Sequence, residues 1–475
     1  MSFQSFSFWA FLIVTLAVCL PLARKQPTGA KLYLTIACLV FYVLGANWSS
    51  FAVLCVGALV SFFTVRQLQA TADPKRRKLL FGLAVGYHIA VLLIFKYTGF
   101  LTAGKISVDW IPLGLSFFTF QQLWLLKEVF TGQFQLETPR EFPLYAFFFP
   151  TVTSGPILRP SDLFSQVSRE NFLRPTWEDA AAGLYGICCG TMKKVLLADS
   201  FGVVVGNGWE RLDKLSAPGA WIVILGYALQ LYFDFSGYCD IATGIARLFG
   251  IRLPVNFNSP YRALSVTDFW KRWHMTLTTF LRECLYFPLG GSRRGAVRTY
   301  CNIMIVFLVS GFWHGVGWTF LFWGALHGLG QVFDRLLGKR QERVPKWIRW
   351  ALTFLFVNLT WIFFRAPDLT SGMELLEIAL TGGFSKANRW LVAGLFGKEA
   401  GAMQILVPAL KNWIDFLRIG LLYGIGILVA FLPQNAVAQM EQFRPKWWQG
   451  IVLVVFTAWS ILSFSGIATF IYSNF

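Results

Sequence analysis

Residues 300–328 read YCNIMIVFLVSGFWHGVGWTFLFWGALHG, a stretch apolar enough for a lipid bilayer that nevertheless contains two histidines, His314 and His327. Ionisable side chains at membrane depth are costly, so they usually face a cavity and mark a pathway or a reaction site. The chain has only four histidines, and a third, His274, closely precedes this stretch. This cluster of three histidines sets the functional question.

The composition of the whole chain is that of a membrane protein. Of its 475 residues, 56% are hydrophobic and 48 are phenylalanine, and the mean hydropathy is +0.55. A soluble core of this length could not bury so much apolar surface. Since one span needs roughly 20 mostly apolar residues, the apolar windows predict an all-α polytopic membrane protein with roughly ten to twelve spans, some shorter segments being re-entrant or interfacial.

Basic residues predict the topology. The first apolar run has no positive charge before it and is followed by basic residues, so we expect a retained span rather than a cleaved signal peptide. The positive-inside rule predicts an outside N-terminus and cytoplasmic loops at the basic sites. These sites are Arg24-Lys25, Lys31, the run KRRK at 75–78, Lys193-Lys194 and Lys339-Arg340.

The net charge of +18 does not indicate a nucleic-acid partner. The basic residues are dispersed along the chain, and no polar domain exists to present a basic face. Topology and the anionic headgroups of membrane lipids explain them better. Because no polar stretch is long enough for a second domain, residues 1–475 are expected to form a single membrane-embedded domain.

The middle of the chain departs from the uniform apolar pattern. It reads YFDFSGYCD at 232–240, NFNSPY at 256–261 and DFWKRWH at 268–274. Aromatic residues mixed with charges and helix breakers suit short helices and re-entrant loops, because irregular backbone at membrane depth is tolerated only where it is packed or lines water. Such an interior can hold a funnel or a tunnel.

His314 lies between two glycines, Gly311 and Gly315. One interpretation is a histidine that is hydrogen-bonded between packed helices. The other is catalysis, because the small neighbours let a substrate approach closely and a neutral imidazole can take a proton near about pH 7. His327, beside Gly328, could face the same cavity if a tight turn or a continuous helix joins it to His314. It would then orient or bind a substrate, or serve as a structural contact.

His274 also has two interpretations. Asp268 and Arg272 are four residues apart and can pair on a helix, which favours an amphipathic helix on the membrane surface with interfacial Trp270 and Trp273. Alternatively, His274 lies at the cytoplasmic mouth of a cavity, near a phosphate-bearing donor.

Two other polar features have structural explanations. Asp234 and Asp240 lie in apolar surroundings and need partners, for which Arg247 and Arg272 are candidates. The segment PLGGSRRG at 288–295 lacks the spacing and ending of a phosphate-binding loop, so it is predicted to be a cytoplasmic turn.

Several motifs together resemble one family. They are YFDFSGY at 232–238, Asn256-Phe257, WKRWH at 270–274, Leu285-Tyr286 with PLGG at 288–291, FWHG at 312–315, and Trp323-Gly324 leading to His327-Gly328. This set resembles the membrane-bound O-acyltransferase family, in the bacterial branch that modifies cell-surface glycans. Weaker similarity extends upstream through Phe95-Lys96-Tyr97 and Ser154-Gly155-Pro156.

The resemblance implies a bowl of helices around a thin floor pierced by a tunnel, which the acyl donor enters from the cytoplasm and the acceptor from outside. It implies that His314, in the Trp-His-Gly motif, is the catalytic base, and that His274 lies near the tunnel as a second catalytic residue. A hydroxyl can attack an acyl thioester directly if a base removes its proton. Donors such as Trp313, His327 or backbone amides would stabilise the oxyanion.

We also expect binding or supporting roles for a set of polar and aromatic residues, with no metal site and no bound cofactor. These residues are His327, Trp313, Arg272, Asp240, Asp268 and Asn302.

The predicted function is O-acetylation of a cell-surface exopolysaccharide or peptidoglycan from acetyl-CoA, at the bacterial inner membrane, directly or with a periplasmic or membrane-tethered acyltransferase partner. One alternative is D-alanyl transfer to teichoic acid from a carrier protein. A proton-coupled transporter would predict inverted repeats, and the sequence contains none that we detect. A noncatalytic scaffold that recruits a periplasmic enzyme is the third alternative.

Overall fold

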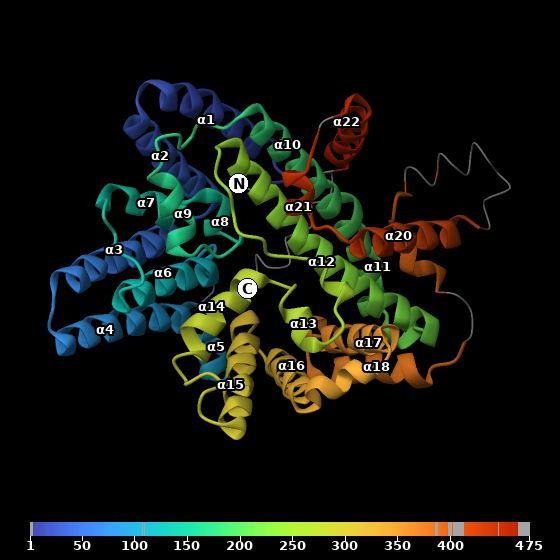
Figure 1. The fold of residues 1–475 in the computed structure, drawn as a ribbon. Helices are drawn as coiled ribbons and strands as arrows, with labels where there is room; N and C mark the ends of the chain where they lie inside the picture. The colour runs from blue at the N-terminus through green and yellow to red at the C-terminus, as the bar shows by residue number, and fades with distance from the viewer. Residues whose placement is uncertain are drawn as a thin grey trace.

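The computed structural model describes residues 3–463 except 107, 109, 385–387, 398–400, 402–412 and 445. All regular secondary structure in these residues is helical (Figure 1). The first half contains α1 (Phe6–Lys25), α2 (Pro27–Gly45), α3 (Trp48–Ala70), α4 (Pro74–Leu92), α5 (Thr98–Leu101), α6 (Leu115–Phe130), α7 (Phe142–Phe147), α8 (Phe149–Val152), α9 (Pro160–Val167), α10 (Trp177–Met192) and α11 (Asp199–Glu210).

The second half contains α12 (Ala217–Leu248), α13 (Val266–Trp270), α14 (Met275–Leu281), α15 (Ala296–His314), α16 (Trp318–Leu337), α17 (Lys346–Arg365), α18 (Leu369–Thr381), α20 (Ile414–Ala430), α21 (Ala436–Glu441) and α22 (Trp447–Leu462). Figure 1 shows long helices at the periphery and α12 crossing the middle, with the short helices α8, α13 and α14 toward the centre. The mixed polar and aromatic segment after α12 therefore lies inside the molecule, as its composition predicts.

The described residues contain seven helices that are long and apolar enough to cross a membrane. They are Phe6–Lys25, Pro27–Gly45, Trp48–Ala70, Pro74–Leu101, Ala217–Leu248, Ala296–His314 and Lys346–Arg365. Three apolar windows that the sequence predicts as spans, residues 142–158, 300–323 and 449–472, do not coincide with any of these seven helices. The window at 142–158 is divided between α7 and α8, each of which carries a proline in its first turn, and the window at 300–323 breaks after His314. The window at 449–472 lies partly outside the described residues.

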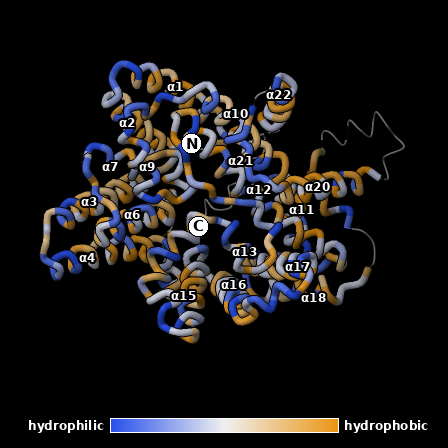
Figure 2. The backbone as a smooth tube through the Cα atoms, viewed as in Figure 1, coloured by the Kyte–Doolittle hydropathy of each residue, from blue (hydrophilic) through white to orange (hydrophobic). Residues whose placement is uncertain are grey.

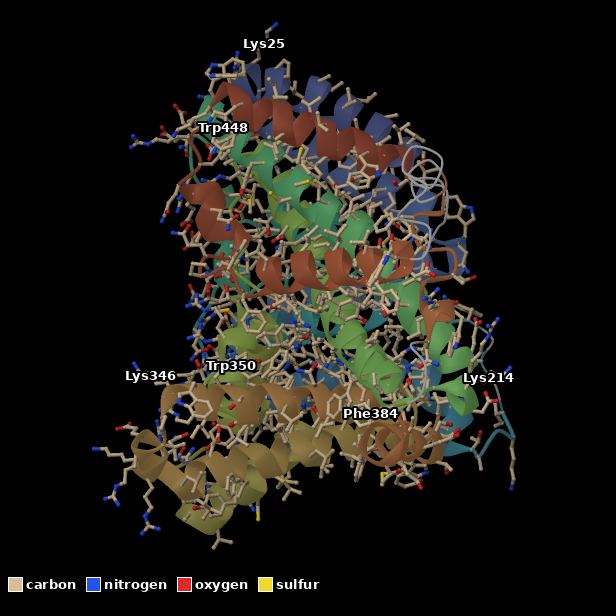
Figure 3. The ribbon with its side chains drawn as sticks, turned by 90° about the vertical axis from the view of Figure 1, so that its right-hand side faces the viewer. Lys25, Lys214, Lys346, Trp350, Phe384 and Trp448 are labelled. Carbon is tan, nitrogen blue, oxygen red and sulfur yellow. The ribbon has the colours of Figure 1, made fainter. Side chains whose placement is uncertain are left out.

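The outer surface of these helices is apolar. Phe63, Leu83 and Leu352 are each more than 60% exposed, although no soluble protein would leave so many large side chains in water. Figure 2 shows hydrophobic residues along the outer helices, with hydrophilic residues gathered mostly near helix ends and connections. The chain is therefore a multi-pass membrane protein. Figure 3 shows Lys346 and Lys214 on opposite sides of it.

One predicted basic loop is instead an internal helix. Lys193 and Lys194 begin a π-helical segment, Lys193–Ala198, that joins α10 to α11 without a loop. Lys193 pairs with Asp240 at 2.6 Å, and Lys194 pairs with Asp234 at 2.7 Å. The prediction of a cytoplasmic loop here is wrong because two buried carboxylates of α12 neutralise these lysines inside the protein.

Glycines allow α10 and α12 to pack closely and antiparallel. A Cβ atom added at Gly237 would lie 2.8 Å from the carbonyl oxygen of Gly190, and one added at Gly244 would lie 2.6 Å from that of Gly183. Small residues that let helix backbones approach are the usual means of helix association in membranes. This packing places the aspartates of α12 beside the lysines that follow α10.

We expect Gly237→Ala to destabilise the protein by about 1–3 kcal/mol, because the added methyl group meets backbone atoms that cannot move aside. Gly206→Ala, in α11, is the matched control, because a Cβ atom there meets nothing within 4 Å. Thermal unfolding in detergent measures the difference, and equal melting temperatures for the two variants would contradict the packing.

Candidate active site

His314 is the last residue of α15. Residues 315–317 form a tight turn, and α16 returns alongside α15. The imidazole is buried, with its centroid 5.1 Å from that of Trp323 and 5.2 Å from that of Phe364. The flanking glycines do not leave space for a substrate. A Cβ atom at Gly311 would approach the backbone of α16, and the ring of Phe320 packs against Gly315. They serve helix packing, which corrects the expectation from sequence.

His327 lies in α16 with both ring nitrogens hydrogen-bonded. Trp270 Nε1 donates to Nδ1 at 3.1 Å, so Nδ1 is unprotonated. Thr360 donates its hydroxyl hydrogen to the Val357 carbonyl oxygen, so Nε2–H of His327 donates to Thr360 Oγ1 at 2.9 Å. A neutral ring with both nitrogens engaged holds α13, α16 and α17 together. This geometry supports the structural interpretation of His327.

One ring nitrogen of His274 is hydrogen-bonded, and the other has no partner among the described residues. The backbone N–H of Thr276 donates to Asn256 Oδ1, which fixes that atom as an acceptor. His274 Nδ1, 3.1 Å from Asn256 Oδ1, must therefore carry the hydrogen. Its Nε2 is buried and has no hydrogen-bond partner among the described residues. Burial lowers the pKa of His274, which lies outside the seven candidate spans, to about 3, so the ring is neutral at physiological pH.

The backbone of His274 is in the left-handed region, with φ of 44°. This conformation is unfavourable for a residue other than glycine and persists only where the surroundings enforce it. Asn256 enforces it twice, because its carbonyl oxygen also accepts the N–H of Met275 at 2.9 Å. The Asn256-Phe257 motif thus positions His274.

The neighbourhood of His274 is the protein core. Trp270 and Trp273 are buried, and Trp273 packs between Phe269 and Trp361. The prediction of a membrane-surface helix with interfacial tryptophans is therefore wrong. His274 itself is fully buried rather than at a cavity mouth.

Trp313 lies between the rings of His274 and His314. Its ring centroid is 6.3 Å from that of His274 and 4.6 Å from that of His314. Phe120 of α6 stacks on Trp313 at 4.9 Å. The helices α6, α14 and α15 thus meet around this one indole.

These three helices carry buried polar atoms without partners among the described residues. They are Thr119 Oγ1 and both amide atoms of Gln122 on α6, Thr278 Oγ1 on α14, and Ser310 Oγ and Trp313 Nε1 on α15, in addition to His274 Nε2. Native proteins rarely leave buried polar groups unsatisfied, so this concentration indicates a place where water or a polar ligand binds.

A pocket of about 220 Å³ opens between α14, α15 and α16. Its polar lining includes Arg282, Ser292 and Arg335 at one end, where Arg335 donates to Ser292 at 3.2 Å. Ser310 and Trp270 line it as well. Ser310 precedes His314 by one helical turn on α15, and no histidine is among the described residues that line this pocket.

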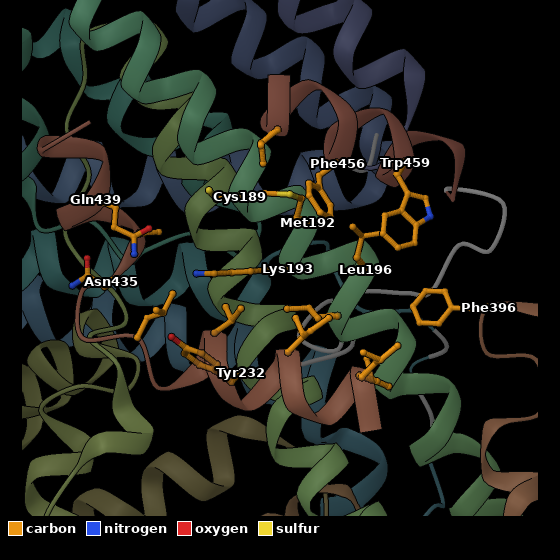
Figure 4. A pocket seen from close by; sticks show the side chains of 18 of the residues that line it. Cys189, Met192, Lys193, Leu196, Tyr232, Phe396, Asn435, Gln439, Phe456 and Trp459 are labelled. Carbon is orange, nitrogen blue, oxygen red and sulfur yellow. The ribbon is translucent and has the colours of Figure 1, made fainter. Parts of the chain in front are cut away.

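A larger pocket, of about 630 Å³, lies elsewhere (Figure 4). Most of its lining residues are apolar, and they come mainly from α10, the π-helical segment after it, α20 and α22. Lys193, Asn435 and Gln439 lie at one end. None of the histidines is among the described residues that line it. It is therefore separate from the histidine cluster.

The other predicted supporting residues have structural contacts. Arg272 pairs with Asp268 at 2.8 Å on a partly exposed helical turn. Asp240 pairs with Lys193, so neither Arg247 nor Arg272 is its partner, which corrects the expected pairing. Arg247 instead pairs with Asp179 at 2.8 Å.

Asn302 is buried on α15 and donates to the carbonyl oxygens of Leu289 and Gly291. It holds the glycine-rich segment, in which Gly290 and Gly291 have φ of 104° and 56°. This segment is a turn, as predicted.

Several residues that position the site were not identified from sequence. Asn256 and Trp270 were parts of motifs without an assigned partner, and Thr360 carried no signal. Lys96 and Tyr97 contact the end of α15, although their motif showed only weak similarity. Within the described residues, no group of three or more potential ligand side chains could hold a metal ion.

Comparisons with known proteins identify similar sequences. Residues 131–367 match the model of the membrane-bound O-acyltransferase family. The chain is 36% identical over 394 residues to the peptidoglycan O-acetyltransferase of Helicobacter pylori, covering 74% of each chain. It is 32% identical over 399 residues to the probable alginate O-acetylase AlgI of Pseudomonas aeruginosa, covering 79% of this chain and 74% of that protein.

The similarity to the teichoic acid D-alanyltransferase of Streptococcus thermophilus is 30% identity over 249 residues, covering 49% of this chain and 59% of that protein. The protein is thus a polytopic membrane enzyme, an acyltransferase. It belongs to the membrane-bound O-acyltransferase family.

We expect His327→Ala to lower the stability by about 1–3 kcal/mol, because it leaves the indole N–H of Trp270 buried without an acceptor. His327→Gln should lose less, since an amide can both accept and donate. Thermal unfolding of the purified variants measures this order. An unchanged melting temperature for His327→Ala would contradict the structural role.

Proposed function

We propose that the protein transfers an acetyl group from a cytoplasmic thioester donor toward a cell-surface polysaccharide at the bacterial inner membrane. The observation that carries the proposal is the alignment on α15 of Ser310, which lines the arginine-bearing pocket, with His314, one turn further along. The relatives named for peptidoglycan and alginate O-acetylation support a polysaccharide acceptor. The teichoic acid relative matches a smaller part of the chain, so D-alanyl transfer is the second candidate.

The proposed chemistry is direct acyl transfer. A hydroxyl oxygen of the acceptor attacks the thioester carbonyl carbon while His314 takes the hydroxyl proton. The tetrahedral intermediate then collapses, the carbon–sulfur bond breaks, and the thiolate leaves and takes up a proton. The N–H of His327 already donates to Thr360, so it is not the oxyanion donor. Trp313 Nε1, buried without a partner among the described residues, fits that role better.

The arginine-bearing pocket suits a phosphopantetheine thioester. Acetyl-CoA and a carrier-bound acyl group both carry this arm, attached through a diphosphate in coenzyme A and through a phosphodiester in a carrier protein, and arginine binds phosphate through charge-assisted hydrogen bonds. Arg282 and Arg335 lie at the pocket end nearest the basic connection between α16 and α17. We assign that face to the cytoplasm, which places the N-terminus outside. Acetyl-CoA is the proposed donor.

The acceptor would reach His314 from the opposite face. The turn after His314 leads to Val316 and Trp318, which are 43% and 68% exposed. A periplasmic or membrane-tethered acyltransferase partner docked on that face could receive the acetyl group or pass it on. The bilayer lipids surround the apolar flanks of the protein.

We expect His314→Ala to lower acetyl transfer by about 10²–10⁴-fold, the usual contribution of a general base. Mass analysis of the surface polymer from cells carrying the variant measures the loss. His88→Gln is the control, because His88 is also buried between spans but pairs with Ser61, away from the site. Full acyl content with a folded His314→Ala protein would disprove the proposal.

We expect Arg335→Gln to raise the acetyl-CoA concentration at half-maximal rate by about tenfold, with a smaller effect on the maximal rate, because one charge-assisted hydrogen bond to phosphate is lost. Arg340→Gln is the matched control, since Arg340 is exposed on the same face but does not line the pocket. Membrane vesicles supplied with acetyl-CoA allow both to be measured. Equal responses of the two variants would exclude the pocket as the donor site.

A further inference from the structure

Two neighbouring residues in the π-helical turn that follows α4 bind the end of α15. The amino group of Lys96 donates to the carbonyl oxygen of Trp313, and the hydroxyl of Tyr97 donates to that of Phe312. The rings of Tyr97 and Phe312 stack with centroids 4.1 Å apart and an interplanar angle of 14°. Both contacts join residues that are more than 200 positions apart in sequence.

The end of α15 needs such partners. The last four carbonyl groups of a helix lack intrahelical donors. Helices commonly satisfy them with a glycine in the left-handed conformation just after the end, but Gly315 is extended, with φ of −166°. Because His314 and Trp313 are buried, water does not readily replace the missing donors. Lys96 and Tyr97 supply two of them.

A π-helical turn brings the two donors together. Leu93–Tyr97 is π-helical between α4 and α5. In a regular α-helix, consecutive side chains point about 100° apart, so two neighbours seldom reach the same target. Single π-helical turns inside helices occur frequently at functional sites. Here Lys96 and Tyr97 are the last two residues of such a turn, and they donate to adjacent carbonyl groups of α15.

Lysine is a costly choice for this position. Lys96 is 7% exposed, and its amino group lies among Trp313, Ser116 and the ring of Tyr97. It also lies 5.8 Å from the centroid of the Trp313 ring. An apolar residue of similar length would fill the space at lower desolvation cost, so a lysine buried at membrane depth indicates a functional requirement.

We propose that Lys96 and Tyr97 are positioning residues that clamp the last turn of α15 and so fix the direction in which His314 presents its imidazole. The inference rests on the proposed role of His314 as the base. The clamp acts on backbone atoms of the two residues before His314, so the ring direction follows from the orientation of that turn. Proton transfer is sensitive to such placement, because misplacement by about 1 Å can lower a rate by about 100-fold.

The test compares Tyr97→Phe and Lys96→Met with the native protein in membrane vesicles supplied with acetyl-CoA, with glycan-bound acetate measured by mass spectrometry. Each variant should lower the maximal rate by about 10- to 100-fold, while the half-saturating acetyl-CoA concentration changes little. Lys96→Gln should recover part of the rate, because its amide can donate to the Trp313 carbonyl oxygen without a charge.

Tyr42→Phe is the matched control. Tyr42 is also buried and donates its hydroxyl hydrogen to a backbone carbonyl oxygen, that of Leu113, at 2.5 Å. It removes the same kind of hydrogen bond away from the histidines, so its maximal rate should stay native. Native rates for Tyr97→Phe and Lys96→Met, or an equal loss of rate in Tyr42→Phe, would overturn the proposal.

Hydrogen–deuterium exchange separates the clamp from the chemistry. Amides of residues 308–318 in the purified full chain should exchange faster in Tyr97→Phe and Lys96→Met than in Tyr42→Phe. Unchanged exchange in both clamp variants would overturn the clamp even if their activity fell. If His314→Ala kept full activity, the proposed function would fail, and exchange would still report whether the clamp holds α15.

Discussion

A polar group inside a bilayer must find its partner within the protein, and this constraint organises the interior of the molecule. Lys193 and Lys194 are neutralised by aspartates of α12, and His327 uses both of its nitrogens between Trp270 and Thr360. Where pairing is complete, the groups hold helices together. Where pairing stops, around Trp313 and His274 Nε2, the described residues leave polar atoms available for a ligand. Neither pocket has a histidine in its described lining, so the buried polar atoms without partners, rather than a cavity, point to the region around Trp313.

Three π-helical turns among the described residues carry charged side chains that find partners inside the protein. Leu93–Tyr97 carries Lys96 and Tyr97, which contact α15, Lys193–Ala198 carries two lysines that pair with α12, and Arg282–Tyr286 carries Arg282, which lines the smaller pocket. In the last turn, Glu283 faces away from that pocket and lies 3.5 Å from Arg159. The first two turns continue directly into another helix, whereas the third ends α14. A charged residue can therefore lie in a helical segment whose backbone N–H and C=O groups remain hydrogen-bonded.

The sequence predicts the class of fold and the family better than the pairing of its residues. Apolar windows predicted a helical membrane protein, and the histidine motifs predicted the family, because hydrophobicity and motif spacing are local properties. The partners of Asp240 and His274 are not local: Lys193 lies 47 residues before Asp240, and Asn256 lies 18 residues before His274. The basic pair Lys193-Lys194 resembled a cytoplasmic loop because charge alone does not reveal a buried carboxylate. The roles of Gly311 and Gly315 were misjudged because a glycine serves substrate access and helix packing equally well, and only the position of α16 distinguishes them.

The end of α15 at His314 explains why this region needs hydrogen-bond donors from another span. A base in the middle of an unbroken span would be covered by its own helix neighbours, whereas a residue at a helix end can face a passage from either side. Ending α15 at this depth exposes carbonyl groups that the bilayer cannot satisfy. The turn at 315–317 provides no glycine cap, so the donors come from another span. The same helix end therefore places His314, the proposed base, beside a turn and requires hydrogen-bond donors from outside α15, which Lys96 and Tyr97 supply.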